Sequence, residues 1–172
     1  FLTNESTMSG EGLSPNANGS GSGSGAAPRV KLLAQYVKDL SFENPGAPMF
    51  STARPAIDLG VDLQARRVEG DQYEIELRLR VLAKHEERTA FLMELSYAGL
   101  ALIQNVPEEV ISQILLIEIP MMLFPFARRV VADTIRDGGM PPLMIEPIDF
   151  ASLYRAKAEQ QQQQMANPTA EA

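Results

Sequence analysis

Apolar and polar residues alternate along the central part of the chain with the period of a β-strand. In residues 57–64 and 74–81 every second position is apolar, so each segment is expected to bury one face and expose the other. Residues 89–103 are apolar on both faces, and residues 31–42 predict a further short strand. The short connections favour antiparallel pairing. The polar face of residues 74–81 is expected to be solvated and to pair across strands; it carries Glu74, Glu76, Arg78 and Arg80.

Helical signals follow the strands. Pro107 suits the first turn of a helix, and the two glutamates after it favour the positive end of the helix dipole. This helix is expected to run toward Arg136, with a break or kink near Pro120 or Pro125. Two consecutive glycines, at 138 and 139, are expected to end it.

A second helix, rich in Ala, Gln and Glu, is predicted from residue 150 to about residue 165. Asp149 stands directly before it and suits the N-cap position. Because the strands come first and the helices afterwards, the pattern predicts an α+β fold.

Within the first predicted helix, residues 114–127 are almost wholly apolar. One acid, Glu118, and two prolines interrupt this run. A membrane helix needs about 20 apolar residues without such breaks, so we expect no direct insertion into a membrane. A segment that is apolar on nearly every side must be buried on nearly every side. A single small domain has difficulty covering it, and we therefore expect a partner subunit.

Composition narrows the class of protein. The 172 residues carry a formal net charge of -7, a sequence pI near 4.8 and an apolar fraction of 45%. This length suits one domain with a real core. The acidity, with no Lys/Arg cluster to offset it, disfavours nucleic-acid binding. The absence of cysteine excludes disulfides and cysteine-ligated metal sites, and with no secretory signal evident it fits a cytoplasmic protein.

Both ends of the chain have low-complexity composition. Residues 1–28 contain a Gly/Ser repeat at 19–25 and are expected to form a disordered tail or linker. Two origins stay open, a natural tail that begins at Met8 or the peptide FLTNEST fused through a linker. Residues 159–172 contain a glutamine run and are expected to form a flexible tail. The folded domain is therefore expected to span residues 29–158.

The sequence contains none of the enzyme motifs that would explain a reaction. There is no G-x-x-x-x-G-K-[ST] phosphate loop, so the use of ATP is not expected. His85 is the sole histidine and lies beside two glutamates in what is expected to be a solvated hairpin turn. No local motif supplies it with partners for a catalytic triad. We predict no enzymatic activity, no cofactor and no bound metal.

Four blocks of the sequence resemble the SecB family of protein-export chaperones. They are YVKDLSFENPGAP (36–48), AFLMELSYAGL (90–100), EIPMMLFPFARRVV (118–131) and GGMPPLMIEPIDFASLY (138–154). The resemblance spans about residues 33–154. It implies a four-stranded antiparallel sheet with two helices packed on one face, assembled as a tetramer that is a dimer of dimers. It also implies an ATP-independent chaperone that holds secretory preproteins unfolded and delivers them to the SecA translocation motor.

The resemblance assigns a SecA-binding surface to the acidic side of the sheet. The matching positions are Asp39 and Glu43 in KDLSFE, with Leu92 and Glu94 in FLMEL. Leu92 and Glu94 are two residues apart on a predicted strand, so they face the same way. Without the resemblance these residues read as ordinary surface acids and a stray leucine.

A client-binding groove is expected between the proline-rich loop after the first strand and the last helix. Large and adaptable side chains suit a groove that accepts many sequences. The candidates are Met49, Phe50, Leu143, Phe150, Leu153 and Tyr154. The alternative for each of them is core packing. The loop reads MFSTARP and the chain has no Trp, so an aromatic contact from this loop must come from Phe50.

Other functions stay open at this point. A SecB-like chaperone that controls a toxin–antitoxin pair would share most of these features. A small enzyme with an unrecognised site would show turnover, and a purely structural oligomeric subunit would show no affinity for unfolded chains.

Overall fold

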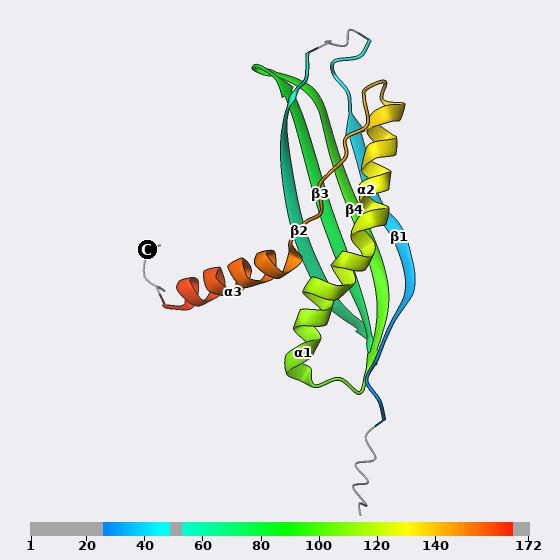
Figure 1. The fold of residues 1–172 in the computed structure, drawn as a ribbon, viewed down its shortest axis with the longest axis vertical. Helices are drawn as coiled ribbons and strands as arrows, with labels where there is room; N and C mark the ends of the chain where they lie inside the picture. Colours follow the sequence, from blue (N-terminus) through cyan, green and yellow to red (C-terminus); the bar gives the residue numbers. More distant parts are fainter. Residues whose placement is uncertain (1–25, 49–52, 167–172) are drawn as a thin grey trace, which may run out of the picture.

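The computed structural model, which describes residues 26–48 and 53–166, is built on one antiparallel sheet (Figure 1). Its strands are β1 (Arg29–Glu43), β2 (Ala56–Glu69), β3 (Gln72–His85) and β4 (Arg88–Gln104). They pair in the order β1-β4-β3-β2, which leaves β1 and β2 at the two edges. Helices follow the strands in the chain. The predicted α+β fold class, with a four-stranded antiparallel sheet and two helices, is confirmed.

The period-two pattern of β3 sorts its side chains between the two faces of the sheet. Ile75, Leu77 and Leu79 are at most 1% exposed, and the register aligns Leu77 with Tyr97 and Leu79 with Leu95 of β4. Because neighbouring strands pleat together, these positions form one apolar face. That face carries most of the core.

The first predicted helix consists of three consecutive pieces, α1 (Glu108–Gln113), a π-helical segment η1 (Ile114–Glu118) and α2 (Ile119–Asp137). The predicted break is η1, directly before Pro120 in the first turn of α2. A proline lacks the N–H that an α-helix requires and its ring crowds the preceding turn, which explains the wider winding there. The helix ends at Gly138, as expected, and Gly139 has a positive φ of 86°.

Helix α2 lies along the apolar face of the sheet, over β4 and β3 (Figure 1). Gly99 of β4 permits this close approach. A Cβ at this position would lie 2.8 Å from Cδ2 of Leu123 and 2.9 Å from Cδ1 of Leu32. At this position the helix therefore rests against the backbone of β4 rather than against a side chain.

Helix α3 (Phe150–Ala166) begins beside η1 and extends away from the sheet (Figure 1). Asp149 caps it as predicted, since its Oδ1 accepts a hydrogen bond of 3.0 Å from the backbone N–H of Ser152. The expected domain boundary after residue 158 falls inside α3, which continues to Ala166. The predicted disorder of residues 1–25 and 167–172 falls outside the described residues.

The continuous helical stretch Glu108–Asp137 has 30 residues and a mean hydropathy of 1.9 in its most apolar window, so by length and composition it is able to cross a membrane. In this fold its buried side chains, such as Leu123 and Val131, pack on the sheet. Met121, Met122 and Phe126 point away from the sheet and are 59%, 49% and 42% exposed. The exposed side is the one that a single chain leaves uncovered.

Candidate binding surfaces

The residues assigned to SecA binding lie together on the sheet face opposite α2. Glu43 of β1 pairs with Leu92 of β4, and Glu94 pairs with Ser41 on the same face. Asp39 lies two residues before Ser41 on β1 and pairs with Ser96. The three acids are exposed and Leu92 is half-buried. We call these four residues, Asp39, Glu43, Leu92 and Glu94, the acidic patch.

A β-bulge places Asp39 on this face. Val37 pairs with Tyr97 and faces α2, whereas Asp39 pairs with Ser96 on the opposite face, so the alternation is shifted at Lys38. The extra residue sends Lys38 to the same face as Asp39. The consecutive side chains of Lys38 and Asp39 thus both project from the acidic side of the sheet, and the residues after the bulge resume regular alternation.

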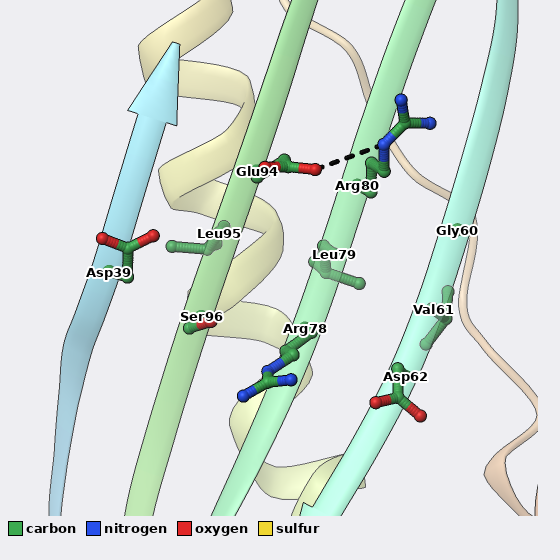
Figure 2. A pocket seen from close by; sticks show the side chains of 10 residues that line it. All are labelled: Asp39, Gly60, Val61, Asp62, Arg78, Leu79, Arg80, Glu94, Leu95 and Ser96. Atoms are coloured by element: carbon green, nitrogen blue, oxygen red, sulfur yellow. Dashed lines mark hydrogen bonds and ion pairs between the residues drawn. The ribbon is translucent and has the colours of Figure 1, made fainter.

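A shallow hollow of about 430 Å³ adjoins the acidic patch over β2, β3 and β4. Figure 2 shows Asp39 and Glu94 on one side of it, Arg78 and Arg80 in the middle, and Gly60 and Asp62 on the other. Nε of Arg80 lies 3.2 Å from Oε1 of Glu94. The hollow is therefore mixed in charge, with two arginines between Asp39 and Glu94 on one side and Asp62 of β2 on the other.

Beside the hollow, two carboxylates of β3 are buried, which corrects the expectation of a solvated polar face. Glu74 and Glu76 are 6% and 7% exposed. Lys38 reaches across β4 and donates to both of them, at 3.0 and 2.8 Å. Arg66 of β2 lies 2.7 Å from Glu74, and the Tyr36 hydroxyl also donates to that carboxylate. The side chains that cover these two acids come from β1 and β2, and sequence spacing alone does not show that these strands flank β3 and β4.

This network perturbs the acids that it surrounds. The hydrogen bond from Tyr36 is the main cause that lowers the pKa of Glu74 to about 2, with Arg66 and Lys38 contributing against the opposing effect of burial. Burial opposes ionisation of Glu76 as well, but hydrogen bonds from Lys38 and Arg78 hold its pKa below the ordinary value. Both side chains are ionised near neutral pH, and the basic side chains that contact them are already paired with them.

A second cavity, of about 180 Å³, lies between β2, η1 and the start of α3. Two of the predicted groove residues, Leu153 and Tyr154, line it together with Leu63 and Leu116. Lys157 closes one side, because its Nζ lies 2.7 Å from Oδ1 of Asp62. The lining of this cavity is mainly apolar, and the cavity is partly open to solvent.

The other groove candidates have different surroundings. Phe150 is 2% exposed and stacks edge-to-face on Phe124 with ring centres 6.1 Å apart, so it is part of the core. Leu143 is half-buried and packs against the core from the connector before α3. Met49 and Phe50 lie outside the described residues.

Sequence reasoning missed several residues of these sites. Lys157 follows Tyr154 by three residues, a spacing that places both on one side of a helix, so this signal was available. Gly60 and Arg80 were not connected with the acidic patch, because the order of the strands was unknown. The cover of Glu74 by Tyr36 depends on a contact across 38 residues of sequence.

The two sites offer surfaces for binding rather than an assembled set of reacting groups. Among the described residues, no group of three or more acidic or histidine side chains is placed to hold a metal ion. One site is an acidic face with a half-buried leucine, and the other is an apolar cavity beside a helix that extends outward. Together they define the chain as a binding protein of the α+β class.

Residues 23–162 match the family model described as preprotein translocase subunit SecB. The chain belongs to the SecB family, a non-enzymatic family of soluble protein-export chaperones. It is 54% identical over 136 residues to the protein-export protein SecB of Maricaulis maris, covering 76% of this chain and 78% of that protein. It is 45% identical to the SecB of Parvibaculum lavamentivorans, covering 92% and 94%.

A solved structure supports the fold. The SecB-like chaperone of Mycobacterium tuberculosis, determined with a peptide from an antitoxin, matches with a TM-score of 0.61 and 15% identity over 70% of this chain and 91% of that one. At this identity the likeness concerns the fold alone. The sequence relatives are export proteins, so the chain is an export chaperone, and control of a toxin–antitoxin pair is not favoured.

Proposed function

We propose that this chaperone captures unfolded preproteins in the cavity beside α3 and passes them to SecA through the acidic patch. Family membership supports the export role, and the position of the acidic patch on β1 and β4, away from the cavity between β2, η1 and α3, supports the division of labour. The single observation that carries the proposal is the gathering of Asp39, Glu43, Leu92 and Glu94 on one accessible sheet face. The cycle is expected to take place in the cytoplasm.

The acidic patch suits a partner that is basic and partly apolar. Leu92 pairs with Leu82 of β3 in the register, so an apolar anchor point lies among the acids. The carboxylates steer a basic partner during its approach. Each exposed ion pair contributes about 0.2–1 kcal/mol, so several must act together.

The proposed assembly is a tetramer, a dimer of dimers, which requires two different self-contacts on each chain. Among the exposed apolar side chains, two groups are the proposed contacts. One is the outer side of α2, with Met121, Met122 and Phe126. The other is the edge strand β1, where Leu33 and Val37 are 41% and 45% exposed. An unpaired edge strand with apolar side chains readily pairs with a second chain.

Two sets of variants test the division of labour. Asp39→Asn with Glu43→Gln and Glu94→Gln is expected to weaken SecA binding at least ten-fold, by summing several pairs. Capture of an unfolded preprotein, measured as suppression of its aggregation without nucleotide, is expected to persist. Leu153→Ser with Tyr154→Ala is expected to weaken the capture of unfolded preprotein and to leave SecA binding near wild type.

A matched control removes three charges elsewhere. Glu69, Glu108 and Glu109 are exposed, and their replacement by Gln is expected to leave both activities near wild type. If this control weakens SecA binding as much as the patch variant does, net charge rather than the patch is responsible and the assignment is wrong.

A further inference from the structure

We propose that Arg80 is a built-in counter-ion of Glu94 that competes with the docking partner and so limits how tightly the acidic patch binds. This inference rests on the proposed docking role of Glu94. It assigns to Arg80 a part in setting the affinity and selectivity of that surface.

Arg80 and Glu94 are direct neighbours in the register of β3 and β4. Their side chains are 48% and 53% exposed, and Nε of Arg80 lies 3.2 Å from Oε1 of Glu94 (Figure 2). An ion pair so open to water is weak and easily exchanged. When a basic group of a partner approaches Glu94, it therefore meets a carboxylate that is already paired, weakly, with Arg80.

The far side of Arg80 is open. Its partner in the register of β2 is Gly60, which offers no side chain to hold the guanidinium. The hollow shown in Figure 2 continues over this glycine. A Cβ at Gly60 would lie 3.6 Å from Cβ of Arg80, an ordinary contact, so the space accepts a side chain.

The neighbouring arginine shows the contrast. Arg78 faces Asp62 in the register of β2, and its Nε is 2.6 Å from the buried Glu76. Arg78 is therefore fixed, whereas Arg80 is able to swing across Gly60. Asp58 stands two positions from Gly60 on the same face and provides a carboxylate for Arg80 once it leaves Glu94, whereas Asp62, two positions to the other side, is already paired with Lys157.

This geometry makes docking an exchange of cations. A partner must bring a positive group that displaces Arg80 from Glu94, while Asp39 and Glu43 stay available to its other positive groups. A segment with one stray cation gains little from such an exchange. Arg80 thus favours a partner that engages several acids of the patch at once.

The test is a double-mutant cycle measured by calorimetry with purified full-length SecA at about 0.15 M salt. Arg80→Gln is expected to lower the Kd about two- to five-fold, the value of one exposed pair. In the Glu94→Gln background the same change is expected to have no effect. Gly60→Val, which fills the hollow and keeps Arg80 against Glu94, is expected to raise the Kd.

Lys84→Gln is the matched charge control. Lys84 is exposed on the same strand, about 13 Å from Arg80 by strand geometry and beyond the screening length of about 8 Å at this salt. The Kd of the Lys84→Gln variant for SecA is expected to equal that of the wild type. If Lys84→Gln and Arg80→Gln lower the Kd by the same factor, the proposal is overturned. If Glu94→Gln weakens binding but Arg80→Gln changes nothing, Arg80 has no such role and the docking site stands. If Glu94→Gln leaves the Kd unchanged, the docking role of Glu94 is wrong, and the inference about Arg80 falls with it.

Discussion

At the scale of single residues, the buried pair Glu74 and Glu76 shows how an acidic sheet face is stabilised. A buried carboxylate is costly unless it is paired and hydrogen-bonded. Here Lys38 binds both acids, and Tyr36 and Arg66 bind Glu74 in addition. Because these donors favour the ionised form, the network stabilises the folded state where Glu74 is charged.

The stability supplied by Glu74 is therefore expected to depend on pH. Its folded pKa of about 2 lies below the ordinary glutamate value of 4.5, so its contribution is present above about pH 4.5 and is lost as the pH falls toward 2. Glu74→Gln is expected to lower the free energy of unfolding at pH 7, and the difference from wild type is expected to shrink between pH 4.5 and pH 2. Urea unfolding followed by circular dichroism at a series of pH values measures this.

The exposed Glu69, at the end of β2, gives the control for this experiment. Glu69→Gln is expected to follow the wild-type curve across the same range. A gap between Glu74→Gln and wild type that stays constant down to pH 2 would contradict the prediction.

The sequence predicted some side-chain positions and missed others for identifiable reasons. Leu92 and Glu94 share a face because strand alternation is local, and that was predicted correctly. The burial of Glu74 was not predicted, because its cover comes from β1 and β2 on either side. Local period-two reasoning describes which face a residue occupies and not what lies over it.

At the scale of elements, the strands and helices were predictable and their irregularities were less so. Period-two alternation identified β2 and β3, and the glycines at 138 and 139 marked the end of α2. The break in the first helix was predicted near Pro120 or Pro125; η1 ends two residues before Pro120, Pro125 lies inside α2, and the π-helical form was not foreseen. The bulge at Lys38 was also missed, because it depends on pairing with β4.

The packing of α2 on β4 yields a prediction at this scale. Gly99→Val places branched carbons within about 3 Å of Leu123 and Leu32 and is expected to lower the free energy of unfolding by about 1–3 kcal/mol. Leu123→Ala alone leaves a cavity and is expected to cost about 2–5 kcal/mol. The double variant is expected to be more stable than the sum of the two single effects, since the new side chain occupies the vacated space. Simple additivity in urea unfolding would show that the two residues do not meet.

At the scale of the whole molecule, the described chain leaves large apolar side chains without cover on the outer side of α2 and on both edge strands, β1 and β2, where Ile57 and Val68 of β2 are 40% and 49% exposed. Both the outer side of α2 and the edge strand β1 carry large apolar residues that are about 40% or more exposed. Contiguous apolar surface of this kind usually marks an interaction site. The sequence indicated the first of these from the run 114–127, whereas the exposure of β1 follows from its place at the edge of the sheet.

Disabling one of these surfaces is expected to halve the assembly rather than to disperse it. In a dimer of dimers one contact builds the dimer and another joins two dimers. Replacing Met121, Met122 and Phe126 by Gln removes the apolar side of α2 with residues that favour helix, so the fold is expected to persist. Light scattering at micromolar concentration is expected to give the mass of four 18.8 kDa chains for the wild type and of two for the variant.

Met144→Gln, at an exposed methionine in the connector, is the control and is expected to stay tetrameric. A wild-type mass of one chain would contradict the proposed assembly, and a tetrameric variant would show that α2 is not a subunit contact.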